Sequence, residues 1–469
     1  MRRILLIALF IIGLANTSFI FAQQNITFYN MTSVDQSGRL NPARMPDNKL
    51  NIGLPVISNT FINVSNSGFA VDDIIKADGD SFVLSTSSLL NSLKEKNHLA
   101  FGIETDFLSI GKRIGKRNYF SFNATLKTSL NFSYDKAPFE ILINGNAPYA
   151  GQTKNLSFGA NSSVYMEYGL GYARTFLKDK LNIGGKFKLL SGVANVSTKK
   201  SDLTLYTDPN NYDLTITSDV DFNYSGPLEM DSLDDPSKYV FGPNKGMAFD
   251  LGATFTFSDK LEFSASILDM GYIKWKDNVT NQRSKNPGTA YTFTGVDIEN
   301  FYNDTADFDE AIEELLDSIG DLFEIVETNE AYRNALPTQI YLGANYHLNK
   351  TTNVGLVIYS QIYKGNVLPG AGLSFNKKFG RILGLYGSYS YYNKNATNLG
   401  VGFSANLGPV QLYAVSDNVL SVFNYYGAQN TNVRFALNLR FGHVGRPSKE
   451  ERKAKRNSGH ERNDGNGSF

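Results

Sequence analysis

The ionisable side chains that could form a binding site lie in stretches where polar and apolar residues alternate. The polar positions of these stretches carry ten candidate lumen charges: Lys127, Glu167, Lys186, Lys188, Asp250, Glu262, Asp269, Asp417, Arg434 and Arg440. Burying an unpaired charge is costly, so such residues pair with one another or meet water. Two interpretations follow, an ion-paired structural interior and a route for a small ligand, and the pattern allows both.

Residues for catalysis are sparse. The four histidines are His98 and His347, near the ends of expected strands, and His443 and His460, in or beside the C-terminal tail. A Ser-His-Asp site needs a histidine held by neighbouring groups, and no such grouping is visible. The chain has no phosphate-binding loop, no zinc-ligand spacing and no cysteine. We therefore predict a protein that is not an enzyme and holds no cofactor. A formal net charge of zero gives no general attraction to nucleic acid.

Strict alternation of apolar and polar residues is the main structural signal. Within 366–378, Val367, Leu373 and Phe375 occupy one side, while Gly370 and Gly372 occupy the other. The same period of two recurs in 119–134, 398–407 and 433–441. Amphipathic strands of this length, rich in interior glycine, are longer than most strands of soluble sandwiches. They fit strands that cross a bilayer with a tilt.

Counting such stretches predicts an all-β fold, a transmembrane antiparallel β-barrel of about 14 strands. Connections alternate between short turns, such as 177–179 and 408–409, and four long loops. Short periplasmic turns and long external loops are typical of outer-membrane barrels. The expected strands are 50–64, 99–111, 119–134, 157–176, 180–197, 245–258, 260–275, 337–348, 351–363, 366–378, 381–392, 396–407, 410–420 and 431–441.

The two longest loops are strongly acidic. Loop 276–335 has fourteen Asp and Glu against four Lys and Arg, and loop 198–244 has nine against three. Within the first, 307–327 has apolar residues at helical spacing and acidic residues opposite, which predicts a short helix in an external loop. That helix would be a solvated cap on neighbouring loops or a lid over the outer mouth.

The ends of the chain divide into three further regions. Residues 1–22 have a basic start and an apolar core too short to span a bilayer, which predicts a cleaved signal peptide. Residues 23–49 lack strand periodicity and are expected to form an N-terminal hatch segment that enters the barrel of residues 50–441. The alternative is a mobile periplasmic arm. Residues 442–469 are polar and basic, as in a disordered tail.

Three segments resemble known families. Asn41, Pro42 and Ala43, early in the mature chain, resemble the hatch motif of FadL-like outer-membrane transporters, which are fourteen-stranded barrels. Segments 267–275 and 413–418 resemble stretches of an uncharacterised family of Bacteroidota barrels, distantly FadL-like. The resemblance implies a bacterial outer-membrane location. It also implies a hatch motif of Arg39, Asn41, Pro42, Ala43 and Arg44, whose arginines could pair with lumen carboxylates such as Asp250 or Glu262.

Two functions are compatible with that resemblance. The first is passage of a small molecule, including a hydrophobic one. The second is a non-transporting barrel that serves as a partner in secretion or in surface-protein assembly. The expected partners are outer-membrane lipid, a small hydrophobic ligand and the barrel-assembly machinery, because the last strand, ending at Phe441, resembles the aromatic-ended signal that this machinery reads.

Overall fold

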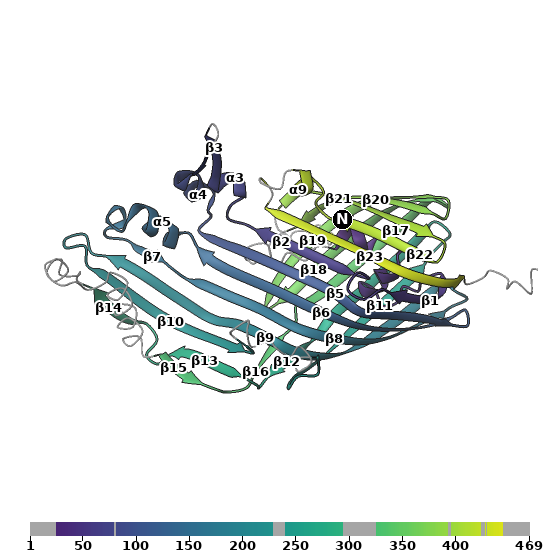
Figure 1. Ribbon diagram of the computed structural model, residues 1–469, viewed down its shortest axis with the longest axis horizontal. Coiled ribbons are helices and arrows are strands. Elements are labelled where there is room, and N and C mark those ends of the chain that lie inside the picture. The colour runs from purple at the N-terminus through teal and green to yellow at the C-terminus, as the bar shows by residue number, and fades with distance from the viewer. Residues whose placement is uncertain are drawn as a thin grey trace, which may run out of the picture.

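The barrel closes on itself through its first and last strands. The computed structural model describes residues 25–78, 81–227, 240–293, 325–392, 395–423, 427 and 429–443. Strand β23 (Asn430–His443) pairs with both β1 (Asn48–Gly53) and β2 (Thr60–Asn66), which in turn pair with β5 (Lys96–Ile114). Counting β1 and β2 as one interrupted strand, the ring contains fourteen antiparallel strands, so the predicted architecture is confirmed (Figure 1).

Neighbours in the ring follow chain order. After β5 come β6 (Asn118–Asp135), β8 (Phe158–Phe176), β9 (Leu181–Thr207), β11 (Asn244–Thr256), β12 (Leu261–Trp275), β17 (Thr338–Asn349), β18 (Thr352–Tyr363), β19 (Asn366–Phe379), β20 (Leu383–Tyr392), β21 (Asn395–Leu407), β22 (Val410–Ser416) and β23. Six tight turns, from the β5–β6 turn to the β21–β22 turn, and the end of β23 lie at one end of the barrel, and the long connections lie at the other, here called the external end (Figure 1). Contrary to the expected alternation, the two-residue turn 364–365 between β18 and β19 also lies at the external end.

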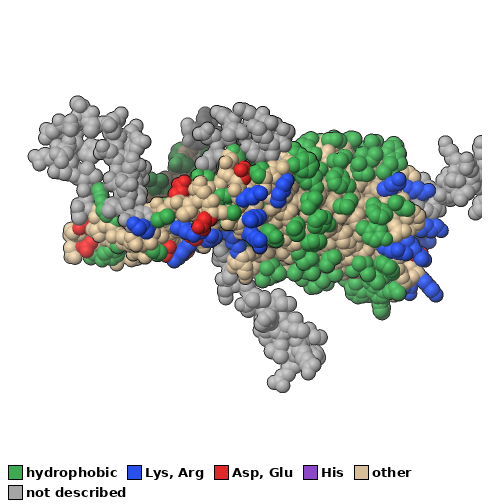
Figure 2. All heavy atoms as spheres, turned by 90° about the horizontal axis from the view of Figure 1, so that it is seen from below, with side chains coloured by type: hydrophobic (Ala, Val, Ile, Leu, Met, Phe, Trp, Pro, Cys, Tyr) green, Lys and Arg blue, Asp and Glu red, His purple; other side chains and the backbone are tan. Residues whose placement is uncertain are grey.

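The alternation in sequence maps onto the two surfaces of the wall. In β19, Leu373 and Phe375 are exposed on the outside, while Gly372 and Ser374 are buried inside. Repeated around the ring, this places an apolar belt on the outer surface, bordered at both ends by Lys and Arg side chains (Figure 2). A surface belt of this kind is stable only against lipid, as in outer-membrane barrels. Among the described helices, none has the length and hydrophobicity that a bilayer crossing requires.

The first strand is broken, which the alternation did not predict. Expected as one strand over 50–64, it is split into β1 and β2 by residues 54–59. Pro55 has no N–H for the ladder, and Val56 adopts a positive φ of 68°, which is unusual for a β-branched residue. Hydrogen bonds from Leu54 N to Leu437 O (3.2 Å) and from Val56 N to Asp106 O (2.8 Å) hold the bulging segment to both neighbours.

The external connections are more ordered than the sequence suggested. β9 continues for 27 residues, roughly 90 Å at about 3.3 Å per residue, whereas about 10 residues cross a bilayer. Its outer half pairs with β7 (Thr153–Asn155) and β10 (Leu214–Ser225). β10 adds β13 (Val279–Ser284) and β14 (Thr289–Phe293), and β13 adds β15 (Ile325–Thr328). We call these strands the external sheet; they extend from the barrel on the left of Figure 1.

Several predicted loops therefore need correction. Loops 198–244 and 276–335 contain β10, β13, β14, β15 and β16 (Tyr332–Ala335), which pairs with β12. Loop 65–97 contains α3 (Val71–Ile74), β3 (Ile75–Asp78), β4 (Ser81–Leu84) and α4 (Thr86–Ser92). Loop 135–156 contains α5 (Ala137–Asn144), η2 (Ala147–Tyr149) and β7.

Other expectations fall partly or wholly outside the described residues. Of the expected helix 307–327, residues 307–324 lie outside them, and 325–327 belong to β15. Strand 410–420 ends at Ser416, before a short helix, α9 (Leu420–Phe423). The expected signal peptide and all of the tail after His443 lie outside the described part of the chain.

Candidate functional site in the barrel lumen

The N-terminal segment lies inside the barrel. It forms α2 (Ile26–Tyr29) and a 3-10 turn, η1 (Asp35–Arg39), and most of residues 25–44 are buried. Its apolar side chains join one cluster with inward-facing residues of β12, β17, β18, β20, β22 and β23. Within it the Tyr29 ring stacks on Tyr341, with centroids 4.8 Å apart and planes 9° apart. We call residues 25–44 the plug.

Glycines of the barrel wall provide the space for the plug. A Cβ placed on Gly343 would lie 2.9 Å from the Tyr29 ring, and one on Gly355 would lie 2.9 Å from Asn30. Real Cβ atoms essentially never come within 3.0 Å of another heavy atom. Corresponding positions on β19, β21, β9 and β11 are Gly372 against Ile26, Gly400 against Thr27, Gly184 against Pro42 and Gly252 against Asn41. The interior glycines noted in the sequence thus form a surface complementary to the plug.

The Asn41-Pro42-Ala43 motif forms a turn against β9, β11 and β12. The Asn41 amide accepts a hydrogen bond from the Ala43 N–H (3.0 Å) and donates to the carbonyl oxygens of Ala253 and Ala265, both at 3.2 Å. Because Pro42 has a fixed φ and no N–H, the turn is stiff and needs few partners. The motif therefore joins the plug to the wall through main-chain acceptors.

Charged wall residues hold the start of the plug. Asp417 accepts hydrogen bonds from the backbone N–H (2.7 Å) and the hydroxyl (2.5 Å) of Thr27. Arg434 donates to Asn25 Oδ1 at 3.0 and 3.2 Å, pairs with Glu104 at 3.0 Å, and lies 4.9 Å above the Phe28 ring. Hydrogen bonds to charged groups are roughly twice as strong as neutral ones, so these contacts fix the first helix of the plug.

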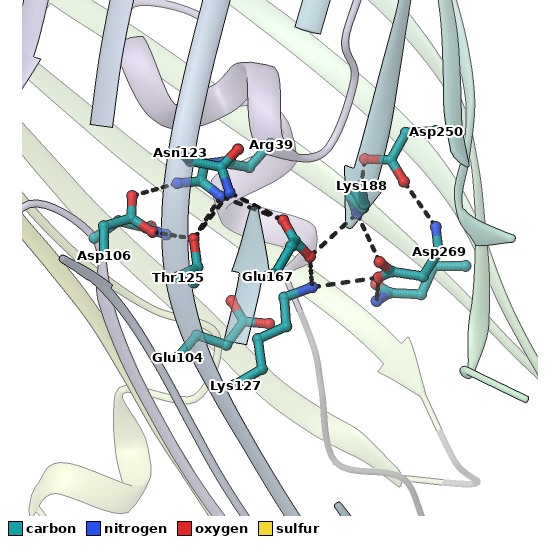
Figure 3. A network of polar contacts seen from close by, with 12 residues as sticks. Arg39, Glu104, Asp106, Asn123, Thr125, Lys127, Glu167, Lys188, Asp250 and Asp269 are labelled. Atoms are coloured by element: carbon teal, nitrogen blue, oxygen red, sulfur yellow. Dashed lines mark hydrogen bonds and ion pairs between the residues drawn. The ribbon is translucent and has the colours of Figure 1, made fainter. Parts of the chain in front are cut away.

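The plug ends in a charged network that spans the lumen (Figure 3). Arg39 pairs with Asp106 and lies 3.8 Å from Glu167, which also meets Lys127 at 2.9 Å and Lys188 at 3.5 Å. Two further carboxylates belong to the network: Asp250 lies 2.8 Å and Asp269 2.6 Å from the Lys188 ammonium. Three cations thus face four carboxylates, and buried Lys186 lines the same space. Mutual pairing is what makes so many buried charges tolerable.

A bulge between β11 and β12 brings the two aspartates of this network together. The register shifts between Phe249 and Leu251, and Asp269 takes a φ of +58°, a conformation that aspartate tolerates better than most residues. The Asp269 N–H donates to Asp250 Oδ1 at 2.8 Å. Asp269 belongs to segment 267–275, and Asp417 to segment 413–418. The two segments whose resemblance stood out in the sequence therefore supply one carboxylate to the network and one to the plug anchor.

The remaining predicted residues have distinct positions. Arg440 pairs with Asp35 of the plug at 3.3 Å and donates to Asn48. Glu262 faces the lumen on β12 and is half-buried, and in the described chain neither it nor Lys186 forms an ion pair. The suggested partners of the hatch arginines were wrong. Arg39 binds Asp106 and Glu167, and Arg44 lies 4.1 Å above the Tyr29 ring and donates to the Tyr29 carbonyl.

Four residues of the site were missed in the sequence. Glu104 and Asp106 occupy inward positions of strand 99–111, so extending the alternation test to that strand would have found them. Asn25 and Thr27 lie in a segment without periodicity, and only the fold shows that they meet Arg434 and Asp417.

Three small cavities follow one another along the lumen. The middle one, about 30 Å³, lies at the network and shares Arg39 and Lys186 with a cavity of about 50 Å³ between the plug and β5, β6 and β8. It shares Lys127 and Asp269 with another of about 50 Å³ toward the external end. Each has room for a few water molecules, and polar and apolar groups both line it. Among the described residues, no cluster of three or more His, Asp or Glu side chains could hold a metal ion.

Fold and lumen together define a plugged, fourteen-stranded barrel with an apolar outer belt. Residues 42–417 match the model of a family of unknown function, DUF5723, so the chain belongs to that family. The expectation of an uncharacterised barrel family is thereby confirmed. No curated protein matches the chain.

Several solved outer-membrane proteins are similar at low identity. The Ralstonia pickettii toluene transporter TbuX is 10% identical, with 87% of this chain and 94% of that one covered, at a TM-score of 0.40. A Pseudomonas aeruginosa FadL homologue is 11% identical, with 87% and 94% covered, at 0.42. The P. putida toluene transporter TodX is 12% identical, with 86% and 93% covered, at 0.36. Similarity at this level carries no argument about function.

Proposed function

We propose that this protein is an outer-membrane barrel with a permanently filled lumen, and that it acts as a non-enzymatic platform for a secreted or surface protein. The observation that carries the proposal is the fit of the plug into the wall. Plug residues lie against glycines on strands from both sides of the barrel, where any other residue would collide. A segment that left the lumen during each transport cycle would not need a wall shaped to it at so many points.

The membrane location is argued from the outer surface. The apolar belt faces lipid, and all but one of the described tight turns lie at the end where β23 finishes, which in outer-membrane barrels is the periplasmic end. The barrel-assembly machinery would read the last strand up to Phe441, whose side chain lies on the outer surface. The external sheet then extends into the space outside the cell.

The external sheet is the surface proposed to bind the partner. It is not needed to cross the membrane, yet its strands are paired over their whole described length. Its face that continues the lumen side carries hydroxyls and charges, among them Lys200, Asp219 and Thr215. A sheet with a mixed polar face suits recognition of another protein better than passage of a small molecule.

Passage of a small solute is the second candidate, favoured by the row of three cavities. Their small volumes, about 30 to 50 Å³, suit water or a small ion better than a larger hydrophobic molecule. Passage of anything larger would require the plug to leave its sites on the wall.

Two measurements separate the candidates. Liposomes containing the intact protein should admit small sugars and ions no faster than empty liposomes. A photo-crosslinking residue at Thr215 should give a discrete protein adduct in cells, whereas the same residue at lipid-facing Ile358 should not. Solute uptake by the intact protein, together with no adduct at Thr215, would overturn the platform and favour passage.

A further inference from the structure

Three cations stand in a row on the outside of the barrel, at the external border of the apolar belt. Lys245 on β11 lies directly opposite Lys274 on β12, and Lys274 lies directly opposite Arg333 on β16. All three side chains are exposed on the outer face. Residues opposite each other in neighbouring strands have Cβ atoms about 5 Å apart, and like charges in such positions repel. In the described part of the chain, none of the three forms an ion pair.

The depth of this row is set by the residues beside it. One step toward the belt, in the same register, lie Met247 and Tyr272, directly opposite each other, and Phe249 follows. The guanidinium of Arg333 lies 5.0 Å from the centre of the Tyr272 ring. Tyrosine is enriched at the boundary between hydrocarbon and headgroups. The ammonium and guanidinium groups therefore lie at headgroup depth while their neighbours face acyl chains. Figure 2 shows Lys and Arg side chains gathered at this border of the belt.

We propose that Lys245, Lys274 and Arg333 bind the phosphate of an anionic lipid headgroup in the external leaflet. A phosphate accepts several charge-assisted hydrogen bonds at once, and a planar guanidinium can bind two of its oxygens. One phosphate between the three side chains would remove the repulsion built into the register. A free anion would satisfy the charges equally well, but only a lipid places its acyl chains on Met247, Tyr272 and Phe249.

This site does not depend on the proposed platform function, because it requires only that the belt lie in a membrane. It also differs from the lumen network, which lies on the opposite face of the same strands. Lys276, two residues beyond Lys274 and just after the end of β12, is also exposed.

The test uses the full-length protein, purified in detergent and loaded with lipid A, phosphatidylglycerol or phosphatidylcholine. Native mass spectrometry should find lipid A or phosphatidylglycerol retained at least tenfold better than phosphatidylcholine. The variant K245Q/K274Q/R333Q should lose this preference. The matched control K116Q/K178Q/K378Q removes three exposed cations in or beside separate turns at the other border, and should change retention less than twofold. Heat-modifiable migration in gels would check that each variant is folded.

A second readout keeps the proposal testable if lipid is lost during purification. Phosphatidylglycerol should raise the thermal transition of the wild type and leave that of K245Q/K274Q/R333Q unchanged. The proposal is overturned if the triple variant retains anionic lipid like the wild type. It is also overturned if inorganic phosphate stabilises the wild type as strongly as phosphatidylglycerol, which would indicate a free-anion site. If anionic lipid binds only to a variant that lacks the acidic residues 228–239, this chain supplies its own counterion. That result would equally refute a lipid site.

Discussion

Replacing Gly184 by alanine should loosen the plug while leaving the wall intact. A Cβ at this position would lie 2.7 Å from the Ala43 nitrogen and closer still to the Pro42 carbonyl, so it meets main chain, which cannot rotate away. Gly184 itself is paired with Ala173 on β8 and Gly252 on β11, so the wall is held on both sides and the plug must move. Overpacking of this kind costs roughly 1–3 kcal/mol, and contact with a rigid proline turn places it at about 2–3.

Gly185→Ala provides the matched control. A Cβ there points to the outer face and meets its nearest atoms, Asp250 O and a Leu251 methyl, at 3.6 Å, an ordinary contact. Replacing a strand glycine without a clash leaves stability unchanged or raises it slightly, by about 0.5 kcal/mol. The two neighbouring substitutions therefore differ in the face on which the added methyl lies.

A single cysteine can report the position of the plug, because the chain contains none. Ser37 is 3% exposed in the plug, so Ser37→Cys should react slowly with a maleimide. In the Gly184→Ala background, opening of the plug releases a strain of about 2–3 kcal/mol. The fraction of molecules with an open plug, and with it the labelling rate of Cys at position 37, should therefore rise roughly 30- to 140-fold. The Gly185→Ala background should match the parent. Equal labelling in both backgrounds, with both barrels folded, would refute the view that these glycines are shaped to the plug.

Two further predictions concern lysine side chains. Lys188→Met should lower the free energy of unfolding in urea by roughly 3–5 kcal/mol, because Asp250, Asp269 and Glu167 lose the cation that they share. Exposed Lys180→Met is the control. Equal losses of stability in the two variants would contradict the network. Partial desolvation of its ammonium, together with repulsion from Lys199, lowers the pKa of Lys364, in the turn between β18 and β19, from 10.5 to about 8. Between pH 8 and about 10.5, Lys364 therefore holds more protons in the unfolded chain than in the folded one. The free energy of unfolding should rise with pH across this interval. Lys364→Met should abolish that rise; a rise that persists would assign it to another group.

The sequence alone determined the strand count, the inward and outward faces and the end of the barrel with short turns. Each follows from local physics, because alternation of period two states which side chains meet lipid and which meet the interior. Leu373 and Gly372 could be assigned to opposite faces without any structure. Most candidate lumen charges could be found in the same way, and Glu104 and Asp106 would have followed from applying the rule to one more strand.

Pairing within the lumen was decided only by the tertiary structure. Arg39 meets Asp106 rather than Asp250 because the curvature of the closed ring and the path of the plug set which inward positions are opposite. Alternation also could not foresee the break at Pro55 and Val56. The extension of β9 was missed because the acidic composition of 198–244 favoured a loop, although Leu214, Ile216, Val220 and Phe222 alternate with polar residues in its partner β10. Interior glycines were visible in the sequence, but their purpose depends on a segment hundreds of residues away. Gly372 and Ile26 become neighbours only when the barrel closes around its own N-terminal segment.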